Sequence, residues 1–472
     1  MDSLANAIHS VYLLLWGDLL TLPLPGGGSV GVSLLVLLLI PTGLYFTVRT
    51  RFLPLRMFPE MLRVTAEKRG GAQNSISGLQ ALIVSTATRV GMGNLVGVVA
   101  AISAGGAGAV FWMWITALIG SSTAFVEAVL AQLYRERDPL YGGYRGGPAY
   151  YMHRWLDKRR GGPPRRHVPI AVFFALSGLI CWCGISQVIG NSVSSAFQNA
   201  FGLPPLWTTV ALVAVSAVIV LRRHASVKVL DVVVPVMAAC YFCITLYLVI
   251  KNAAILPDVF RRIFEEAFGL RQAVAGGLGA VVMNGVKRGL FSNEAGSGSA
   301  PCAAAAANTG HPVKAGLLQA LGVFIDTIVI CSCTAFIMLV TPQDQVAGLA
   351  GMDLLQASME YHLGRFGVVF IAVILWLFSF STFIGVLFYA RSNVAYLCGD
   401  NWISQTAYKV LALGMLFMGG LAAYSFVWDL GDVGVGLMTV CNILMILPMS
   451  REALASLREY EAQQKTDRQR PA

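Results

Sequence analysis

An apolar segment long enough to cross a membrane is interrupted by glycines, an arginine and an asparagine. The arginine is Arg89, and the interruption itself is expected at Gly91, Met92, Gly93 and Asn94. Backbone that leaves helical geometry inside hydrocarbon must line a cavity or be buried in protein, because each unsatisfied amide or carbonyl group costs several kcal/mol. The free amide groups at such a break can bind a carboxylate, and we expect the Asn94 side chain to orient it.

Close packing against another helix is the alternative explanation for these glycines, as in GxxxG helix pairs. Packing alone does not require an asparagine and an arginine within about one turn of each other. We therefore interpret the stretch as a binding site.

A second interruption lies in the other half of the chain, between Phe291 and Pro301. Its carbonyl groups are expected to accept hydrogen bonds from an ammonium group, with the Phe291 ring as a wall. The residues expected to line the site here are Phe291, Ser292, Asn293, Ala295 and Gly296. Paired broken helices in corresponding positions are typical of secondary transporters built from inverted repeats.

The composition is that of an integral membrane protein. Of the 472 residues, 56% are hydrophobic and only 12% are charged, which leaves too little polar surface to coat a water-soluble protein of this size. The net charge is +10, but Lys and Arg cluster in short loops between apolar runs, which is the positive-inside pattern and not that of nucleic-acid binding. Cysteines lie in or beside apolar runs, so we expect them to be small packing residues rather than disulfides or zinc ligands.

Apolar runs of about 17 to 25 residues predict about eleven membrane spans. They lie at 30–48, 76–104, 107–134, 168–198, 205–221, 229–250, 272–306, 314–341, 366–392, 405–424 and 430–449. Without the first span, two sets of five remain, and each set opens with a broken helix. Because five is odd, two copies of the repeat must run with opposite topology.

The loops also predict orientation and domain limits. Most basic residues fall on one side of the eleven-span arrangement, which places the N-terminus outside and the C-terminus in the cytoplasm. We expect an interfacial helix in residues 1–29, including Ile8 to Leu24, then a transporter domain at 30–450 and a cytoplasmic tail at 451–472. A surface helix from Pro257 to Phe268 would explain the basic residues of one loop on the other side.

Several motifs resemble the alanine or glycine:cation symporter family. They are GMGNLVGVVAAISAGGAGAVFWMW (91–114), EAVLAQLYRERD (127–138), GGPAYYM (146–152), GVKRGLFSNEAGSGSAPCAAAAA (285–307) and DTIVICSCTA (326–335). The resemblance covers about residues 50 to 450 and implies an all-α membrane protein with about eleven transmembrane helices. Its fold would be the leucine-transporter (LeuT) 5+5 inverted repeat with one extra N-terminal span. It also implies sodium-coupled import of a small neutral amino acid, such as alanine or glycine, across a bacterial-type inner membrane.

The sodium ligands follow from this resemblance together with the chemistry of the residues. Carbonyl groups at the first break and hydroxyl groups of the ninth span are suitable oxygen ligands. The expected ligands are Ala87, Val90, Ser381 and Thr382. Ser and Thr in membrane helices usually bond back to their own backbone carbonyl groups, and this alternative stays open.

The chain departs from the family pattern at three positions expected to line the pocket. Met92 stands where the family has threonine, Ile189 where it commonly has glutamine, and Val386 where it has tryptophan. Losing an amide and an indole removes polar groups and bulk, while methionine adds flexible apolar volume. We therefore expect a changed substrate preference.

Charged residues at membrane depth are expected to face protein or water, since each is costly against lipid. For Glu294 and Asp326 we expect structural pairing with a nearby arginine rather than ion or proton chemistry. A proton-coupled or uncoupled amino-acid transporter of the same fold is the alternative function, followed by a membrane-embedded enzyme or channel. An enzyme would need a constellation such as HExxH, and the sequence has none, so we expect no catalytic residues.

Overall fold

The computed structural model describes residues 2–23, 29–66, 76–77, 89–222, 230–270, 277–422 and 424–469. Helices make up most of these residues, and the strands form three short pairs. The antiparallel pairs are β1 (Leu20–Pro23) with β2 (Ser29–Val32) and β4 (Glu136–Arg137) with β5 (Tyr144–Arg145); the parallel pair is β3 (Ile76–Ser77) with β6 (Ala307–Asn308).

Six helical segments in these ranges are long and apolar enough to cross a membrane. They are α7 (Gly108–Leu133), α9 (Pro169–Phe201), α11 (Leu230–Lys251), α19 (Arg365–Cys398), α21 (Tyr424–Gln469) and a continuous run of α15 (Pro312–Val323), the π-helix η4 (Phe324–Cys331) and α16 (Ser332–Leu339).

Shorter helices complete the described structure. The apolar ones are α2 (Leu34–Arg49), α10 (Pro205–Val220), α20 (Trp402–Leu421) and the run of the π-helix η1 (Gly93–Gly97) and α6 (Val98–Gly105). The others are α1 (Asp2–Trp16), α3 (Leu53–Arg56), α4 (Phe58–Ala66), α8 (Pro148–Arg160), the 3-10 helix η3 (Ala253–Ile255), α12 (Leu256–Ala267), α13 (Gly277–Asn293), α14 (Pro301–Ala306), α17 (Gln343–Val346) and α18 (Gly351–Leu363).

The helices agree with the main features of the sequence prediction. The chain is an all-helical, multi-pass protein, and each predicted span overlaps at least one described helix. The predicted surface helix is also present as α12, where Arg261 pairs with Glu265 and Arg262 with Glu266, one turn apart. The count of eleven membrane spans and the inverted repeat stay predictions.

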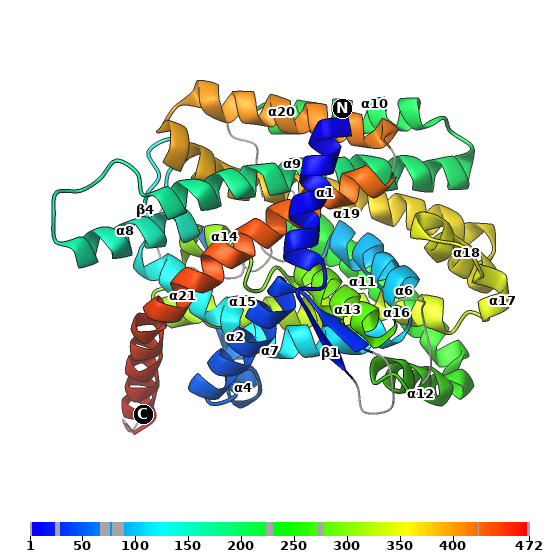
Figure 1. The fold of residues 1–472 in the computed structure, drawn as a ribbon, viewed down its shortest axis with the longest axis horizontal. Helices are drawn as coiled ribbons and strands as arrows, with labels where there is room; N and C mark the ends of the chain where they lie inside the picture. The colour runs from blue at the N-terminus through cyan, green and yellow to red at the C-terminus, as the bar shows by residue number, and fades with distance from the viewer. Residues whose placement is uncertain are drawn as a thin grey trace.

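Helix α9 lies at the centre of the packing, against α19, α20 and α21 (Figure 1). Its contact with α21 is close because glycines lie at the crossing. A Cβ atom added to Gly434 on α21 would lie 2.4 Å from the Cα atom of Cys181 on α9. Small residues that let helix backbones approach are the usual way to pack helices in a membrane, where lipid is as apolar as the side chains.

The N-terminal helix differs from the prediction in its bounds. We expected helix from Ile8 to Leu24, but α1 ends at Trp16 and a β-hairpin follows. Gly17 follows the last turn, and Leu19 then bonds to Val32 across the hairpin, which removes these residues from helical pairing. Figure 1 shows α1 crossing α21. Its place at the membrane interface stays a prediction.

Candidate functional site

The first break is a tight turn followed by a π-helix. The amide of Gly91 donates to the carbonyl of Arg89 at 2.8 Å and to the side-chain oxygen of Asn94, also at 2.8 Å. The π-helix η1 begins two residues later, and π-turns inside helices frequently mark functional sites. The Asn94 side chain therefore provides the hydrogen-bond acceptor for a backbone amide at the break, a role that its position in the sequence only partly indicated.

The second break lies between α13 and α14. Glu294 follows α13 with a φ of 57°, and Gly296 has a φ of 95°, a backbone conformation that glycine adopts without strain. The amide of Gly296 donates to Glu127 at 3.3 Å, and its carbonyl accepts from Asn442 at 3.0 Å. Asn442 also donates to Glu127 and accepts from Tyr151. Gly296 is thus held by protein, which leaves the carbonyl groups nearer Ser292 as the better acceptors for a ligand.

The two breaks meet face to face. A Cβ atom added to Gly93 would lie 3.3 Å from the Cα atom of Ser292 and 3.5 Å from the carbonyl oxygen of Phe291. The side-chain amide of Asn94 donates to Ser292 Oγ at 3.3 Å. A side chain at position 93 would push the neighbouring backbone by a few tenths of an ångström, so Gly93 favours this close approach. The packing explanation therefore applies to this glycine, and the binding explanation stays a prediction.

Asp326 on η4 joins the two breaks. Its carboxylate accepts from Asn94 Nδ2 at 2.7 Å, from Ser292 Oγ at 2.9 Å and from Thr327 Oγ1 at 2.8 Å, and the residue is fully buried. In the described part of the chain, Asp326 forms no ion pair, and the guanidinium of Arg89 instead donates to the carbonyl of Gln319 at 3.2 Å. The expected structural pairing with an arginine is therefore not a direct ion pair. The groups that contact the Asp326 carboxylate are neutral donors, while the Arg89 charge acts on Asp326 and Glu294 only from a distance.

Other buried polar atoms near the second break lack partners. Asn293 Nδ2 and Glu294 Oε2 have no hydrogen-bond partner among the described residues, although both residues are buried. The first is a donor and the second an acceptor. A buried group without a partner is costly, so both are suited to a ligand that supplies the missing partner.

The two predicted hydroxyl ligands of sodium, Ser381 and Thr382, lie on α19, and Thr382 contacts the first break. Thr382 Oγ1 accepts from the amide of Met92 at 3.2 Å and donates to the carbonyl of Phe378 at 2.9 Å. Ser381 also donates to Phe378, at 2.8 Å. Both hydroxyl groups thus make the backbone contacts expected of Ser and Thr in helices, and their oxygen lone pairs are oriented away from that carbonyl. Val90 is buried and lies two residues before Met92 in the sequence, and Ala87 lies outside the described residues.

Ile189 and Val386, two of the positions expected to line the pocket, lie on neighbouring helices. Ile189 and Val386 are buried on α9 and α19, which pack together. Trp182 is seven residues before Ile189, and Tyr389 is three residues after Val386, so each pair shares a helix face. The rings of Trp182 and Tyr389 lie 6.1 Å apart, which shows that these two faces look toward each other.

A buried ionic cluster that was not predicted from the sequence lies beside Phe291. Asp432 accepts two hydrogen bonds of 3.0 Å from Arg288 and lies 3.3 Å from the Lys287 ammonium. The Arg288 guanidinium lies 4.0 Å from the ring centre of Trp428, and that ring is 4.9 Å from the ring of Phe291. The sequence did contain a signal for this cluster. One acidic residue lies inside the last predicted span, and two basic residues lie inside another.

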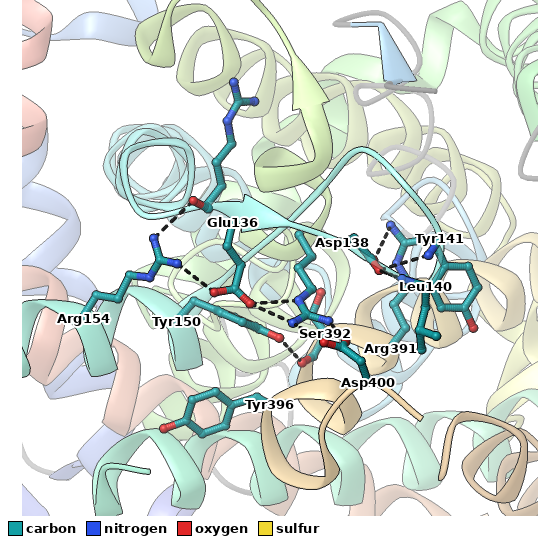
Figure 2. Close-up of polar contacts among 12 residues, drawn as sticks. Glu136, Asp138, Leu140, Tyr141, Tyr150, Arg154, Arg391, Ser392, Tyr396 and Asp400 are labelled. Carbon is teal, nitrogen blue, oxygen red and sulfur yellow. Dashed lines mark hydrogen bonds and ion pairs between the residues drawn. The ribbon is translucent and has the colours of Figure 1, made fainter. Parts of the chain in front are cut away.

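A second ionic cluster holds the end of α19. Glu136 accepts from Arg154 at 2.7 Å and from Arg145 at 2.8 Å, and Arg145 also pairs with Asp400 just beyond α19 (Figure 2). Tyr150 donates to the carbonyl of Ser392 at 2.9 Å. These contacts tie the segment between α7 and α9 to the helix that carries Ser381, Thr382 and Val386.

Helix α8 contributes a further ion pair to this region. Arg165 lies 2.8 Å from Asp157, and its hydrogen bonds lower the pKa of the Asp157 carboxyl below its usual value. The carboxyl is therefore ionised at neutral pH and remains available to His153, 3.1 Å away.

Sequence comparison identifies the family. The profile of the Sodium:alanine symporter family matches residues 27–472. The chain belongs to this family. It is 43% identical to the Probable sodium/glutamine symporter GlnT of Bacillus subtilis, covering 92% of this chain and 89% of that one. It is 33% identical to the Sodium/alanine symporter AgcS of Methanococcus maripaludis, covering 92% and 95%.

A solved membrane transporter shares the fold. A mutant of the Eremococcus coleocola manganese transporter matches with a TM-score of 0.51 at 14% identity, over 83% of this chain and 81% of that one. This sodium:alanine symporter family member is therefore a helical, multi-pass membrane transporter and not an enzyme.

Substitution of the two buried aspartates, Asp326 and Asp432, should have different effects on thermal stability. Asp326→Asn should keep the unfolding temperature near that of the wild type in sodium-free buffer, because its partners are neutral and hydroxyl groups can turn to suit an amide. Asp432→Asn should lower it strongly, because removing one partner of a buried ion pair costs about 3–5 kcal/mol. Thermal unfolding of the purified proteins in choline and sodium salts measures both effects.

Sodium provides the decisive comparison for Asp326. Addition of sodium should raise the unfolding temperature of the wild type. In Asp326→Asn, which lacks the charge, most of this increase should be lost. If Asp326→Asn unfolds as easily as Asp432→Asn and still responds fully to sodium, Asp326 has only a structural role.

Proposed function

We propose that the protein imports a small neutral amino acid together with sodium by alternating access. The contact between the two helix breaks, closed by Asn94, Ser292 and Asp326, is the observation that carries this proposal. An amino acid needs donors for its carboxylate and acceptors for its ammonium within one small site. Two opposed helix breaks supply both from the backbone.

The substrate's charged groups have specific candidate partners. We propose that the carboxylate binds at the start of η1, at the amide groups of the stretch from Gly91 to Asn94, with Asn293 Nδ2 as an additional donor. Since the amides of Gly91 and Met92 already have protein partners, binding would exchange these contacts for the ligand. The ammonium would bind the carbonyl groups between Phe291 and Ala295 and the free Glu294 oxygen.

Two sets of oxygen atoms are proposed to bind sodium. The first consists of the carbonyl groups of Ala87 and Val90 with the hydroxyl groups of Ser381 and Thr382, supported by the contact of Thr382 with Met92. The second is the Asp326 carboxylate with Ser292 and Thr327. A buried carboxylate that makes no direct ion pair in the described structure is favourable for a cation, because a buried charge without a close partner of opposite charge is costly.

The placement in the cell follows from the charge pattern. We propose that the transporter lies in the bacterial inner membrane, with its N-terminus outside and its C-terminus in the cytoplasm. The interfacial segment 1–29, the transporter domain 30–450 and the tail 451–472 remain the proposed divisions.

A larger amide-bearing substrate is a second candidate. Val386 stands where the family has a bulky tryptophan, on a helix that packs against α9, and we propose that the smaller side chain leaves room for a longer substrate. The relative GlnT is described as a probable sodium/glutamine symporter. Glutamine is therefore the substrate to compare with alanine and glycine.

Ion replacement tests the proposed function. Uptake of labelled alanine, glycine or glutamine into vesicles should require sodium and fall to background when choline replaces it at fixed pH. Replacing both hydroxyl residues, Ser381→Ala with Thr382→Ala, should weaken the sodium dependence more than it lowers the amount of folded protein. Uptake that follows a pH gradient in choline would instead support the proton-coupled alternative.

Substrate preference is tested by restoring the family residues. The variant Met92→Thr, Ile189→Gln, Val386→Trp should shift preference toward alanine or glycine and away from glutamine. The reason is that an apolar pocket discriminates by only about 1–3 kcal/mol per methylene, whereas polar groups left without partners reject a ligand more strongly. Competition by a panel of amino acids measures the ranking. An unchanged ranking with intact transport would exclude these residues from the pocket.

A further inference from the structure

Five arginine side chains converge on one cleft where α2 ends. The cleft has a volume of about 410 Å³ and lies between the α2–α3 turn and α21. Its basic residues are Arg49, Arg51, Arg56, Arg451 and Arg458, and its acidic residue is Glu461. The two chain segments are about 400 residues apart in the sequence. The cluster of positive charge is therefore formed by the fold and not by a local run of basic residues.

Most of this positive charge is not compensated by protein. Glu461 pairs with Arg56 at 2.6 Å. The four remaining arginines form no ion pair with any carboxylate that the structure describes. Arg458 instead donates to the carbonyl of Leu454 in its own helix, at 3.3 Å. The cleft therefore carries an excess of positive charge that an anion could neutralise.

The backbone of the α2–α3 turn, which carries Arg51, is held in an unusual conformation. Arg51 and Phe52 have φ values of 54° and 53°, in the left-handed region that residues with side chains rarely adopt. The turn is held by a hydrogen bond from the Phe52 amide to the carbonyl of Thr47 at 2.8 Å and by one from Arg56 to the carbonyl of Thr50 at 3.2 Å. Such strain persists only where surrounding contacts determine the conformation.

On its other side, the cleft is formed by the distal part of α21. Figure 1 shows α21 bending toward its C-terminal end, and Pro448 lies inside this helix. Proline removes a backbone hydrogen bond and is a common cause of such bends. Arg451 and Arg458 follow the proline, so a ligand in the cleft would link α2 to the segment beyond the bend.

The apolar surroundings identify the kind of anion. Exposed apolar residues on α2 share one face through their spacing, and they are Leu37, Leu44, Tyr45 and Val48. Val48 is 63% exposed and also lines the cleft. Beyond the turn, Phe52 and Leu55 are exposed as well. The exposed apolar face of α2 thus ends at Val48 beside the arginines, which suits a molecule with an acyl chain and an anionic head.

We propose that this cleft binds the phosphate group of an anionic phospholipid, whose acyl chains lie along the exposed face of α2. Arginine is well suited to this role because its planar guanidinium donates paired hydrogen bonds to phosphate oxygens. Basic clefts at the cytoplasmic ends of membrane helices are suitable binding sites for anionic headgroups. In the proposed orientation, the lipid belongs to the cytoplasmic leaflet.

Lipid binding to designed variants tests the proposal. The variant Arg49→Gln, Arg51→Gln, Arg451→Gln removes three cleft charges, and the control Lys158→Gln, Arg159→Gln, Arg160→Gln removes three charges from the last turn of α8. Native mass spectrometry with phosphatidylglycerol measures affinity, and phosphatidylcholine reports binding without net charge. Each arginine near a membrane surface contributes about fivefold, so the cleft variant should bind phosphatidylglycerol roughly 100-fold more weakly. The control should match the wild type.

Competition experiments distinguish a lipid ligand from a soluble anion. Inorganic phosphate and glycerol phosphate should not displace phosphatidylglycerol from the wild type, because they lack acyl chains. Equal phosphatidylglycerol binding by the cleft variant and the control would overturn the proposal, as would displacement by inorganic phosphate at matched concentration. If the triple variant does not fold, Arg458→Gln alone should weaken phosphatidylglycerol binding about fivefold, and unchanged binding would count against the site.

Discussion

Backbone amide and carbonyl groups cannot be left without partners inside a membrane, and this constraint shapes the centre of the molecule. At the first break the Asn94 side chain bonds to the Gly91 amide, and at the second break Glu127 and Asn442 bond to the backbone of Gly296. Each break is therefore closed by side chains from within the break or from neighbouring helices. Contacts made in this way can be exchanged for a ligand without exposing backbone to lipid.

The buried carboxylates near the breaks have different surroundings. Asp432 lies against Arg288 and Lys287, so its charge is neutralised by protein. Asp326 accepts hydrogen bonds from neutral groups of both breaks. The first arrangement fixes α13 against α21, whereas we propose that the second is completed by a cation. This difference explains why we centre the coupling of sodium to substrate on Asp326. The residues that donate hydrogen bonds to its carboxylate, Asn94 and Ser292, also belong to the proposed substrate site.

Much of the architecture could be predicted from the sequence because its signals are local. Glycines in apolar runs indicated both breaks, and the basic residues of one loop on the non-cytoplasmic side indicated α12. The bounds of α1 were wrong because pairing between Leu19 and Val32 depends on a partner strand that helix periodicity does not reveal. The partners of Asp326 and Asp432 were missed for a related reason. Asn94 and Asp326 are 232 residues apart, and only the packed fold brings them together.

Coupling between sodium and substrate in the purified protein tests the central claim most directly. If both bind at the junction of the two breaks, each must increase the affinity for the other by the same factor. We expect alanine or glutamine to raise the unfolding temperature markedly in sodium and very little in choline. An equal rise in both salts would show that the amino acid binds without sodium, and would contradict the account of a shared site around Asn94, Ser292 and Asp326.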